Sequence, residues 1–372
     1  MTRHWAMSLS DRFFSRFGSM AVRTLDYSAL TAPVSRTTVT AWRAQARASG
    51  LPWATTTLSA STIVGLVTLV VSFVFIFGGL LASVLTESIQ RGNAIGVIFP
   101  SIFVVVIALV TIGAIRARTT HGGQWERWYR LAAFAQANGL MFRPMDFPPA
   151  YPGEIFHLGR NPVVTEHLET SGRFTDIGNF RYITGSGKSE TTHTWGFLAI
   201  YLDRAMPNIV LDAKANNSLF GSNLPVALDK KQILHLEGDF DQHFTLYCPA
   251  EYEQDALYIF TPDLMGLLID QASPYDVELV DQWMFVYSSK PFELTDPAVL
   301  QRLFTIADTV GAKAVTQTAH YADDRVGNPA ANIVAPQGAR LKRGASVVGI
   351  VIAVVFIGFW GWNFFSSFFL TP

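Results

Sequence analysis

The sequence has almost no cysteine, no complete catalytic motif and three long stretches without charge. Cys248 is the only cysteine among 372 residues, so no disulfide can form within one chain. This excludes a small disulfide-stapled secreted fold and suits a reducing compartment. The first 55 residues contain no apolar core with a cleavage site, so we expect no cleaved signal peptide. Without a catalytic motif the sequence identifies no substrate.

The three stretches without charge are residues 63–85, 94–115 and 347–365. Each is close to the roughly 20 apolar residues that a helix needs to cross a bilayer. Trp360 and Trp362 stand near the end of the third run, where indole rings favour the membrane interface. The pattern predicts three transmembrane helices. None of these runs contains Asp, Glu, Lys, Arg or His. This absence counts against a transporter, because transporters usually keep ionisable groups along their pathway.

Basic residues beside these runs predict their orientation. Seven arginines precede the first run, whereas the turn between the first two holds one Arg against one Glu. Basic pairs or triplets follow the second run and precede the third: Arg116, Arg118, Arg340, Lys342 and Arg343. By the positive-inside rule these clusters are cytoplasmic. We therefore expect a multi-pass inner-membrane protein with its N-terminus and large domain in the cytoplasm and its C-terminus outside.

The predicted organisation follows from these boundaries. It comprises a basic N-terminal cytoplasmic arm (1–57), a transmembrane hairpin (58–118), a cytoplasmic domain (119–316), a linker (317–343), a third transmembrane helix (344–366) and an external tail (367–372). The arm has seven Arg against two Asp, whereas residues 121–343 have 18 basic against 26 acidic groups. Phosphate contacts supply most nucleic-acid affinity, so this acidic domain predicts no nucleic-acid partner.

Within the arm, residues 9–22 fit either a basic amphipathic helix on a lipid surface or a disordered segment, and both interpretations stay open. Residues 37–50 show no strong structural pattern. In the domain, the sequence predicts helices at 124–138, ended by Gly139, and at 297–310, with Asp296 as N-cap and Gly311 as its end. Thr261-Pro262-Asp263 marks the start of another helix.

Alternating and apolar runs predict the strands. Residues 195–203 are apolar on both faces, which indicates a central strand. Further strands are expected at 180–184, 208–212, 232–236, 244–248 and 256–260, with a hairpin formed by 277–280 and 283–287. Residues 148–172 have weak periodicity. The fold class is therefore α+β, a mostly antiparallel sheet with flanking helices, joined to three transmembrane helices.

Aromatic and basic residues at the start of the first predicted domain helix suggest a membrane anchor. Trp125, Arg127, Trp128 and Arg130 follow the second apolar run after a few residues, as Trp360 and Trp362 close the third. Indole and guanidinium groups favour the interface, so we expect these six residues there. The alternative is that the tryptophans pack on the domain.

One cluster has the composition of a metal site. His235, Glu237, Asp239, Asp241 and His243 alternate, and in one extended strand they would share a face and offer ligands for a divalent metal. Gly238 favours a turn instead.

Two other motifs are expected to have a structural role, without catalysis or ligand binding. Gly185-Ser186-Gly187-Lys188-Ser189 ends like a phosphate-binding loop, but Tyr182 occupies the position of the required first glycine, and a strand follows, so we expect a hairpin loop. Cys248 has no partner motif and is expected to act as a small apolar residue.

Three stretches carry a family resemblance: DAKANN at 212–217, LEGDFDQHFTLYCPAEYEQDALYIFTPDLMGLLID at 236–270 and VELVDQWMFVY at 277–287. They resemble a group of uncharacterised bacterial inner-membrane proteins of unknown function, which join a few membrane spans to a cytoplasmic α+β domain. The resemblance implies this architecture and brings no activity, cofactor or catalytic residue.

Three functional hypotheses follow. The first is a non-enzymatic, multi-pass membrane protein that needs no cofactor and whose cytoplasmic domain binds another membrane or cytoplasmic protein or organises an assembly, with the lipid bilayer and a second copy of itself as further partners. The second is a membrane-bound, metal-dependent hydrolase that uses the cluster at 235–243. The third is a transporter or channel subunit. The lack of a catalytic motif favours the first.

Overall fold

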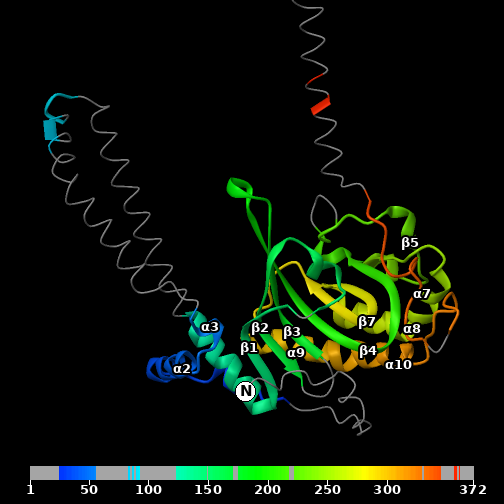
Figure 1. The fold of residues 1–372 in the computed structure, drawn as a ribbon, viewed down its shortest axis with the longest axis horizontal. Coiled ribbons are helices and arrows are strands. Elements are labelled where there is room, and N and C mark those ends of the chain that lie inside the picture. Colours follow the sequence, from blue (N-terminus) through cyan, green and yellow to red (C-terminus); the bar gives the residue numbers. More distant parts are fainter. Residues whose placement is uncertain are drawn as a thin grey trace, which may run out of the picture.

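The structure is a computed structural model, and it describes residues 25–55, 83, 86–87, 89–92, 123–148, 150–170, 175–217, 222–328, 331–344, 356–357 and 360. Its centre is one antiparallel sheet of seven strands (Figure 1). The strand order is β1-β2-β3-β4-β6-β5, and β7 pairs with β4 outside this path. The strands are β1 (Leu140–Asp146), β2 (Arg160–Thr170), β3 (Thr175–Thr184), β4 (Thr191–Ala213), β5 (Ile233–Leu234), β6 (Phe244–Tyr247) and β7 (Asp276–Ser288).

The long strand β4 organises the sheet. Its first half pairs with β3, its last residues pair with β6, and its other edge pairs with β7 along most of its length. Leu198 and Ile200 on one face and Phe197 and Ala199 on the other are all buried. The predicted central strand is therefore confirmed, and it continues through residues 208–212 as one bent strand.

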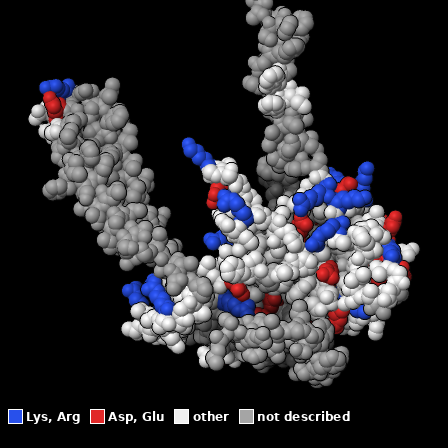
Figure 2. Space-filling view, in the orientation of Figure 1, with Lys and Arg blue, Asp and Glu red and all other residues white. Residues whose placement is uncertain are grey.

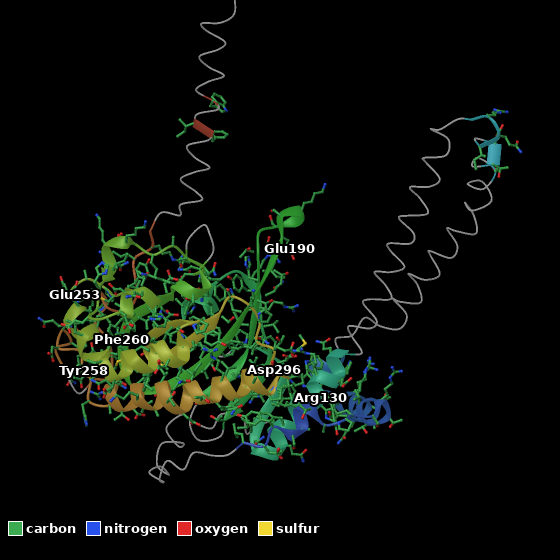
Figure 3. All side chains as sticks on the ribbon, turned by 180° about the vertical axis from the view of Figure 1, so that it is seen from behind. Arg130, Glu190, Glu253, Tyr258, Phe260 and Asp296 are labelled. Carbon is green, nitrogen blue, oxygen red and sulfur yellow. The ribbon has the colours of Figure 1, made fainter. Side chains whose placement is uncertain are left out.

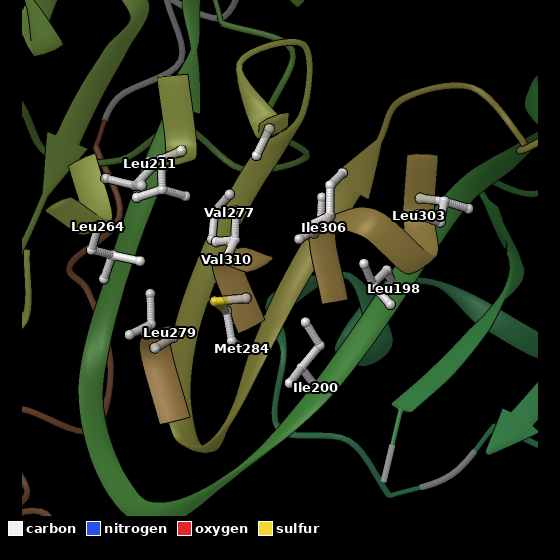
Figure 4. Packing of buried hydrophobic residues seen from close by; sticks show 14 of the residues in the cluster. Leu198, Ile200, Leu211, Leu264, Val277, Leu279, Met284, Leu303, Ile306 and Val310 are labelled. Atoms are coloured by element: carbon white, nitrogen blue, oxygen red, sulfur yellow. The ribbon is translucent and has the colours of Figure 1, made fainter. Parts of the chain in front are cut away.

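Helices cover one face of the sheet. They are α8 (Pro262–Leu267), α9 (Pro297–Ile306), the single turn η7 (Ala307–Gly311) and α10 (Ala312–Thr318). Figure 4 shows side chains of these helices, such as Leu264, Leu303, Ile306 and Val310, against apolar side chains of β4 and β7. The spacing of leucines in the sequence explains this packing, because residues three and four apart share one helix face.

The ends of these helices agree with the sequence only in part. Asp296 caps α9 as predicted, because its side chain accepts a hydrogen bond from the Ala298 backbone N–H at 2.9 Å. Gly311 does not end the helix, which continues to Thr318. A Cβ atom on Gly311 would lie 2.7 Å from Cδ1 of Ile200. A residue with a side chain would therefore clash with the sheet, whereas glycine allows the helix to pack closely against it.

Aromatic residues cover part of the opposite face. The segment 150–158, which contains the turn η2 (Glu154–His157), places Tyr151, Ile155 and Phe156 over the sheet. Their partners include Phe180, Phe197 and Phe285, all fully buried. This second core is separate from the helical one, so the sheet is buried on both sides here.

The N-terminal arm is folded over residues 25–55, contrary to the expectation for 37–50. It forms α1 (Ser28–Thr31), α2 (Arg36–Ala48) and α3 (Pro52–Thr55). Ser35 caps α2 by accepting from the Thr38 N–H, the kind of cap that polar sequences provide. Residues 9–22 lie outside the described residues.

The prediction of three transmembrane helices is not supported, and the fold class is corrected to an α+β sheet with helices. No helix among the described residues is long and apolar enough to cross a membrane. Charge-free runs predicted these helices from hydropathy alone. The runs 63–85, 94–115 and 347–365 lie almost entirely outside the described residues, so the topology and membrane localisation that depended on them have no support in the described structure.

Several strand predictions were also wrong. Residues 256–259 belong to the helix α7 (Glu253–Ile259), Phe260 follows its end, and 277–287 form one strand in place of a hairpin. Asp281 has a φ of 51° where the pairing of β7 with β4 is irregular, which explains why its polar residues resembled a turn. The strands β1 and β2 were missed. Because β2 carries its own irregularity at Glu166 (φ 54°), its alternation is interrupted.

Candidate functional site: a basic patch on the C-terminal segment

The C-terminal segment, residues 331–344, most of which belongs to the predicted linker (317–343), is attached to the domain. Its end pairs with residues 227–229: Asp229 N–H donates to Lys342 O at 3.0 Å, and Gly344 N–H donates to Ala227 O at 2.8 Å. The buried side chain of Gln232 makes two hydrogen bonds to the backbone of Lys342. Its Nε2 donates to Lys342 O and its Oε1 accepts from the Lys342 N–H, both at 2.9 Å.

A second anchor lies on β4. The Asn208 N–H donates to Gly338 O at 2.8 Å, and its side-chain Oδ1 accepts from the Leu341 N–H at 3.0 Å. The same side chain donates through Nδ2 to Oε1 of the buried Glu278 at 2.8 Å. Asp323 adds a third anchor, since its carboxylate accepts from the Tyr252 hydroxyl and the Ala335 N–H. The segment is thus held at several points along its length.

This attachment brings together basic residues that lie more than 100 positions apart in the sequence. We call them the basic patch: Lys230, Lys231, Arg340, Lys342 and Arg343. All five are exposed. Figure 2 shows Lys and Arg side chains gathered on this part of the surface, near the position of β5 in Figure 1. Among the five, the structure records a carboxylate partner for Arg343, whose guanidinium lies 2.6 Å from Glu154 Oε1.

The patch contrasts with the charge of the rest of the domain. Residues 121–343 other than the patch hold 13 basic against 26 acidic side chains. The charges of five neighbouring cations add up, so the patch creates a local positive potential on an otherwise acidic domain. Such a potential attracts an acidic surface and accelerates association with it.

A small cavity lies beneath the patch. Leu224, Pro225, Val226 and Leu228 line it from one side, and Arg343 borders it. Its volume is about 30 Å³, which has room for a water molecule but not for a substrate.

Polar groups at the floor of the cavity are already paired. Glu278 accepts hydrogen bonds from the Tyr287 hydroxyl and the Glu154 N–H, both at 2.9 Å. Burial raises the pKa of Glu278, and these hydrogen bonds oppose the shift. The cavity therefore offers structural polar contacts and no open reaction site.

The predicted metal cluster is not one extended strand. Gly238 has a φ of 76° and makes a turn, as its identity suggested, and the short helix α6 (Phe240–His243) follows. Only one pair of the five meets directly: His235 Nδ1 lies 2.6 Å from Asp241 Oδ2, with the His235 side chain 79% exposed. Glu237, Asp239 and His243 make no such contact with this pair. No group of three or more His, Cys, Asp or Glu in the described chain is placed to hold a metal.

Four of the six predicted membrane anchors, Trp125, Arg127, Trp128 and Arg130, make contacts within the protein. Trp125 and Trp128 are buried and pack with Trp42 and Trp53 of the arm, which is the alternative that the sequence left open. Arg127 binds Glu166 and Glu293. Trp360 is 65% exposed, and Trp362 lies outside the described residues.

Arg130, labelled in Figure 3, also binds within the protein. Its guanidinium donates to the carbonyl groups of Leu30 at 2.7 Å and Ala32 at 2.8 Å, and thereby attaches α1 of the arm.

The two remaining motifs are structural. Residues 185–190 connect β3 to β4 as the predicted hairpin loop, and Glu190, labelled in Figure 3, is the last residue of the loop before β4. Cys248 is buried, and burial raises its pKa to about 12, so its thiol is not ionised at neutral pH. A thiol must lose its proton to act as a nucleophile.

Comparison with known proteins adds little. No family model matches the chain, and no curated protein matches it. A solved structure with some likeness is the mycobacterial trehalose monomycolate transport factor A, TtfA, at a TM-score of 0.33 and 9% identity, covering 50% of this chain and 94% of that one. A likeness this distant carries no argument about function, and the resemblance to inner-membrane proteins stays a prediction.

Proposed function

We propose that this is a non-enzymatic binding protein whose domain binds the acidic surface of a partner protein through the basic patch. The observation that supports the proposal is the patch itself. Four of its five cations, Lys230, Lys231, Arg340 and Lys342, have no carboxylate ion pair among the described residues. Charges in that state are available to a partner.

The construction of the patch supports a binding role. Its two halves come from a loop and from the C-terminal segment, and backbone hydrogen bonds hold these halves side by side. A rigid surface loses little conformational freedom when it binds, which favours affinity. The half-buried residues Leu224, Pro225 and Val226 lie beside the patch, and protein interfaces combine such apolar residues with a charged rim.

A charge-reversal experiment on the full-length protein tests the proposal. The patch variant carries Lys230→Glu, Lys231→Glu, Arg340→Glu and Lys342→Glu, and keeps Arg343 because it pairs with Glu154. The matched control reverses four exposed cations elsewhere, Arg36, Arg181, Lys188 and Lys290. Both variants have the same net charge, so only the position of the change differs. Circular dichroism establishes that each is folded.

The readout is quantitative cross-linking in cells with a photoreactive amino acid in place of Gln337, an exposed neighbour of the patch. We expect one cross-linked partner protein whose attached peptide is acidic. Its yield should fall about tenfold or more with the patch variant, remain with the control and decrease as salt increases. Equal yields from both variants would reject the proposal. So would cross-links only to lipid, or only to a second copy of this chain.

A further inference from the structure

Two aspartates lie opposite each other where β4 ends and β7 begins. Leu211 pairs with Val277, so the next residues, Asp212 and Asp276, occupy facing positions on the same side of the sheet. Asp212 is 3% exposed and Asp276 is 0% exposed. No Lys or Arg in the described chain forms an ion pair with either carboxylate. Two buried like charges at adjacent positions are unfavourable unless something compensates them.

Three buried oxygens at this place have no hydrogen-bond partner: Oδ1 of Asp212, Oδ2 of Asp276 and Oδ1 of Asn216. The other polar side-chain atom of Asp276 and that of Asn216 are occupied. Asp276 Oδ1 accepts from the Ala213 N–H at 2.9 Å and from Asn216 Nδ2 at 3.2 Å. Asn216 Nδ2 also donates to Pro274 O at 3.3 Å. These two acceptors determine the amide orientation and leave its oxygen unpaired.

Buried oxygens rarely remain without a partner, because each costs the free energy of its lost hydration. A proton shared between the two carboxyl groups would satisfy Asp212 and Asp276, and burial does raise the pKa of Asp276 to about 7. It would leave Asn216 Oδ1 unsatisfied. A bound cation can be coordinated by all three oxygens, and its positive charge offsets the negative charges of both carboxylates.

We propose that Asp212, Asp276 and Asn216 bind a hard divalent cation of the Ca²⁺ class. Two carboxylates and an amide oxygen are ligands that Ca²⁺ takes readily in irregular geometry, with backbone carbonyls or water completing its coordination. The ligand set contains no nitrogen or sulfur, so it disfavours zinc and copper. The site joins β4, β7 and the turn η4 (Lys214–Asn216), so the bound ion holds the end of the sheet together.

The test is calcium binding by the full chain after treatment with EDTA. Isothermal titration with CaCl₂ and thermal unfolding are measured for the wild type and two variants, Asp276→Asn and Asn216→Ala. The control is Asp239→Asn, because Asp239 is an exposed acid of the previously considered cluster. We expect one Ca²⁺ per wild-type chain and a rise of about 5 °C in Tm at a hundredfold excess over Kd.

The variants discriminate between the explanations. Both site variants should lose the heat of binding and the rise in Tm, whereas Asp239→Asn should keep them. Asn216→Ala removes no charge, so it remains informative if Asp276→Asn fails to fold. The proposal is overturned if the wild type binds no Ca²⁺, if either site variant binds it as tightly as the wild type, or if the control loses binding. Stabilisation of the wild type by acid but not by Ca²⁺ would assign a shared proton to the pair and overturn it as well.

Discussion

Four buried tyrosines in this protein donate hydrogen bonds to carboxylates. The pairs are Tyr151 with Asp176, Tyr252 with Asp323, Tyr287 with Glu278 and Tyr321 with Asp255. In each pair the hydroxyl donates to a carboxylate oxygen, and burial raises the pKa of the tyrosine. These acids therefore complete the core. In the sequence alone, such acids suggest catalysis or metal binding. The tyrosine that each acid binds belongs to another part of the chain, so the pairs become visible only in the fold.

One of these pairs predicts a dependence on pH. Burial raises the pKa of Asp176 above its unfolded value of 3.8, although the Tyr151 hydrogen bond opposes the shift. Between the two pKa values the native state binds more protons than the unfolded state, so stability falls as pH rises through this window. Asp176→Asn should make that decline smaller by the contribution of Asp176, while other buried acids with raised pKa values, such as Asp276 and Glu278, keep theirs. Urea unfolding at about pH 4 and about pH 7 measures the difference.

The control for this prediction is Asp296→Asn, an exposed helix cap that cannot reproduce the effect of a buried carboxyl group. An identical pH dependence in the wild type and Asp176→Asn would contradict the prediction.

At the scale of elements, local sequence signals predicted where helices lie, but not what the side chains of these helices contact. The helix at 123–138 and its end at Gly139, where φ is 64°, follow from residues close together in the chain. The role of Trp125 and Trp128 cannot be predicted from neighbouring residues, because an indole ring suits both a membrane interface and a protein core. Trp42 and Trp53, about 80 residues earlier, determine which applies, and no local pattern reveals that contact.

The tryptophan cluster predicts how the arm is held. Trp42 contacts Trp53, Trp125 and Tyr129. Trp42→Ala should therefore release α2, at a cost of about 2 kcal/mol from lost apolar contact. Hydrogen exchange of residues 36–48 should accelerate while that of the sheet stays unchanged. Gln45→Ala on the exposed face of α2 serves as the control, and equal protection in both variants would show that the cluster does not hold the arm.

At the scale of the whole molecule, the attachment of the C-terminal segment was the feature that sequence reasoning missed. Residues 317–343 are small and polar, which is typical of a flexible linker. The side chains that hold this segment, Asn208 and Gln232, are ordinary strand and loop residues in their local context. The α+β class and the central strand β4 could be predicted, because periodicity encodes burial. The basic patch could not, because it exists only after residues 230 and 342 come together.

The attachment can be tested at Gln232. Gln232→Ala leaves the Lys342 N–H without its side-chain acceptor, whereas the Lys342 carbonyl keeps the Asp229 N–H, and an unsatisfied group of this kind costs about 1–3 kcal/mol. We expect faster hydrogen exchange in residues 338–344 than in the wild type. Gln254→Ala, at an exposed position of α7, should leave exchange unchanged. Unaltered protection of the segment in Gln232→Ala would mean that backbone pairing alone holds it.

The same attachment has a consequence for the order of synthesis. A ribosome releases the chain from its N-terminus, and domains usually begin to fold as they emerge. Here Asn208 and Gln232 receive their partners from the C-terminal segment only when residues 338–342 have been made, more than 100 residues later. Translation of nearly the whole sequence must therefore precede completion of this face. A nascent chain arrested before residue 338 would carry the sheet, with the Asn208 Oδ1 and the Gln232 amide still without these partners.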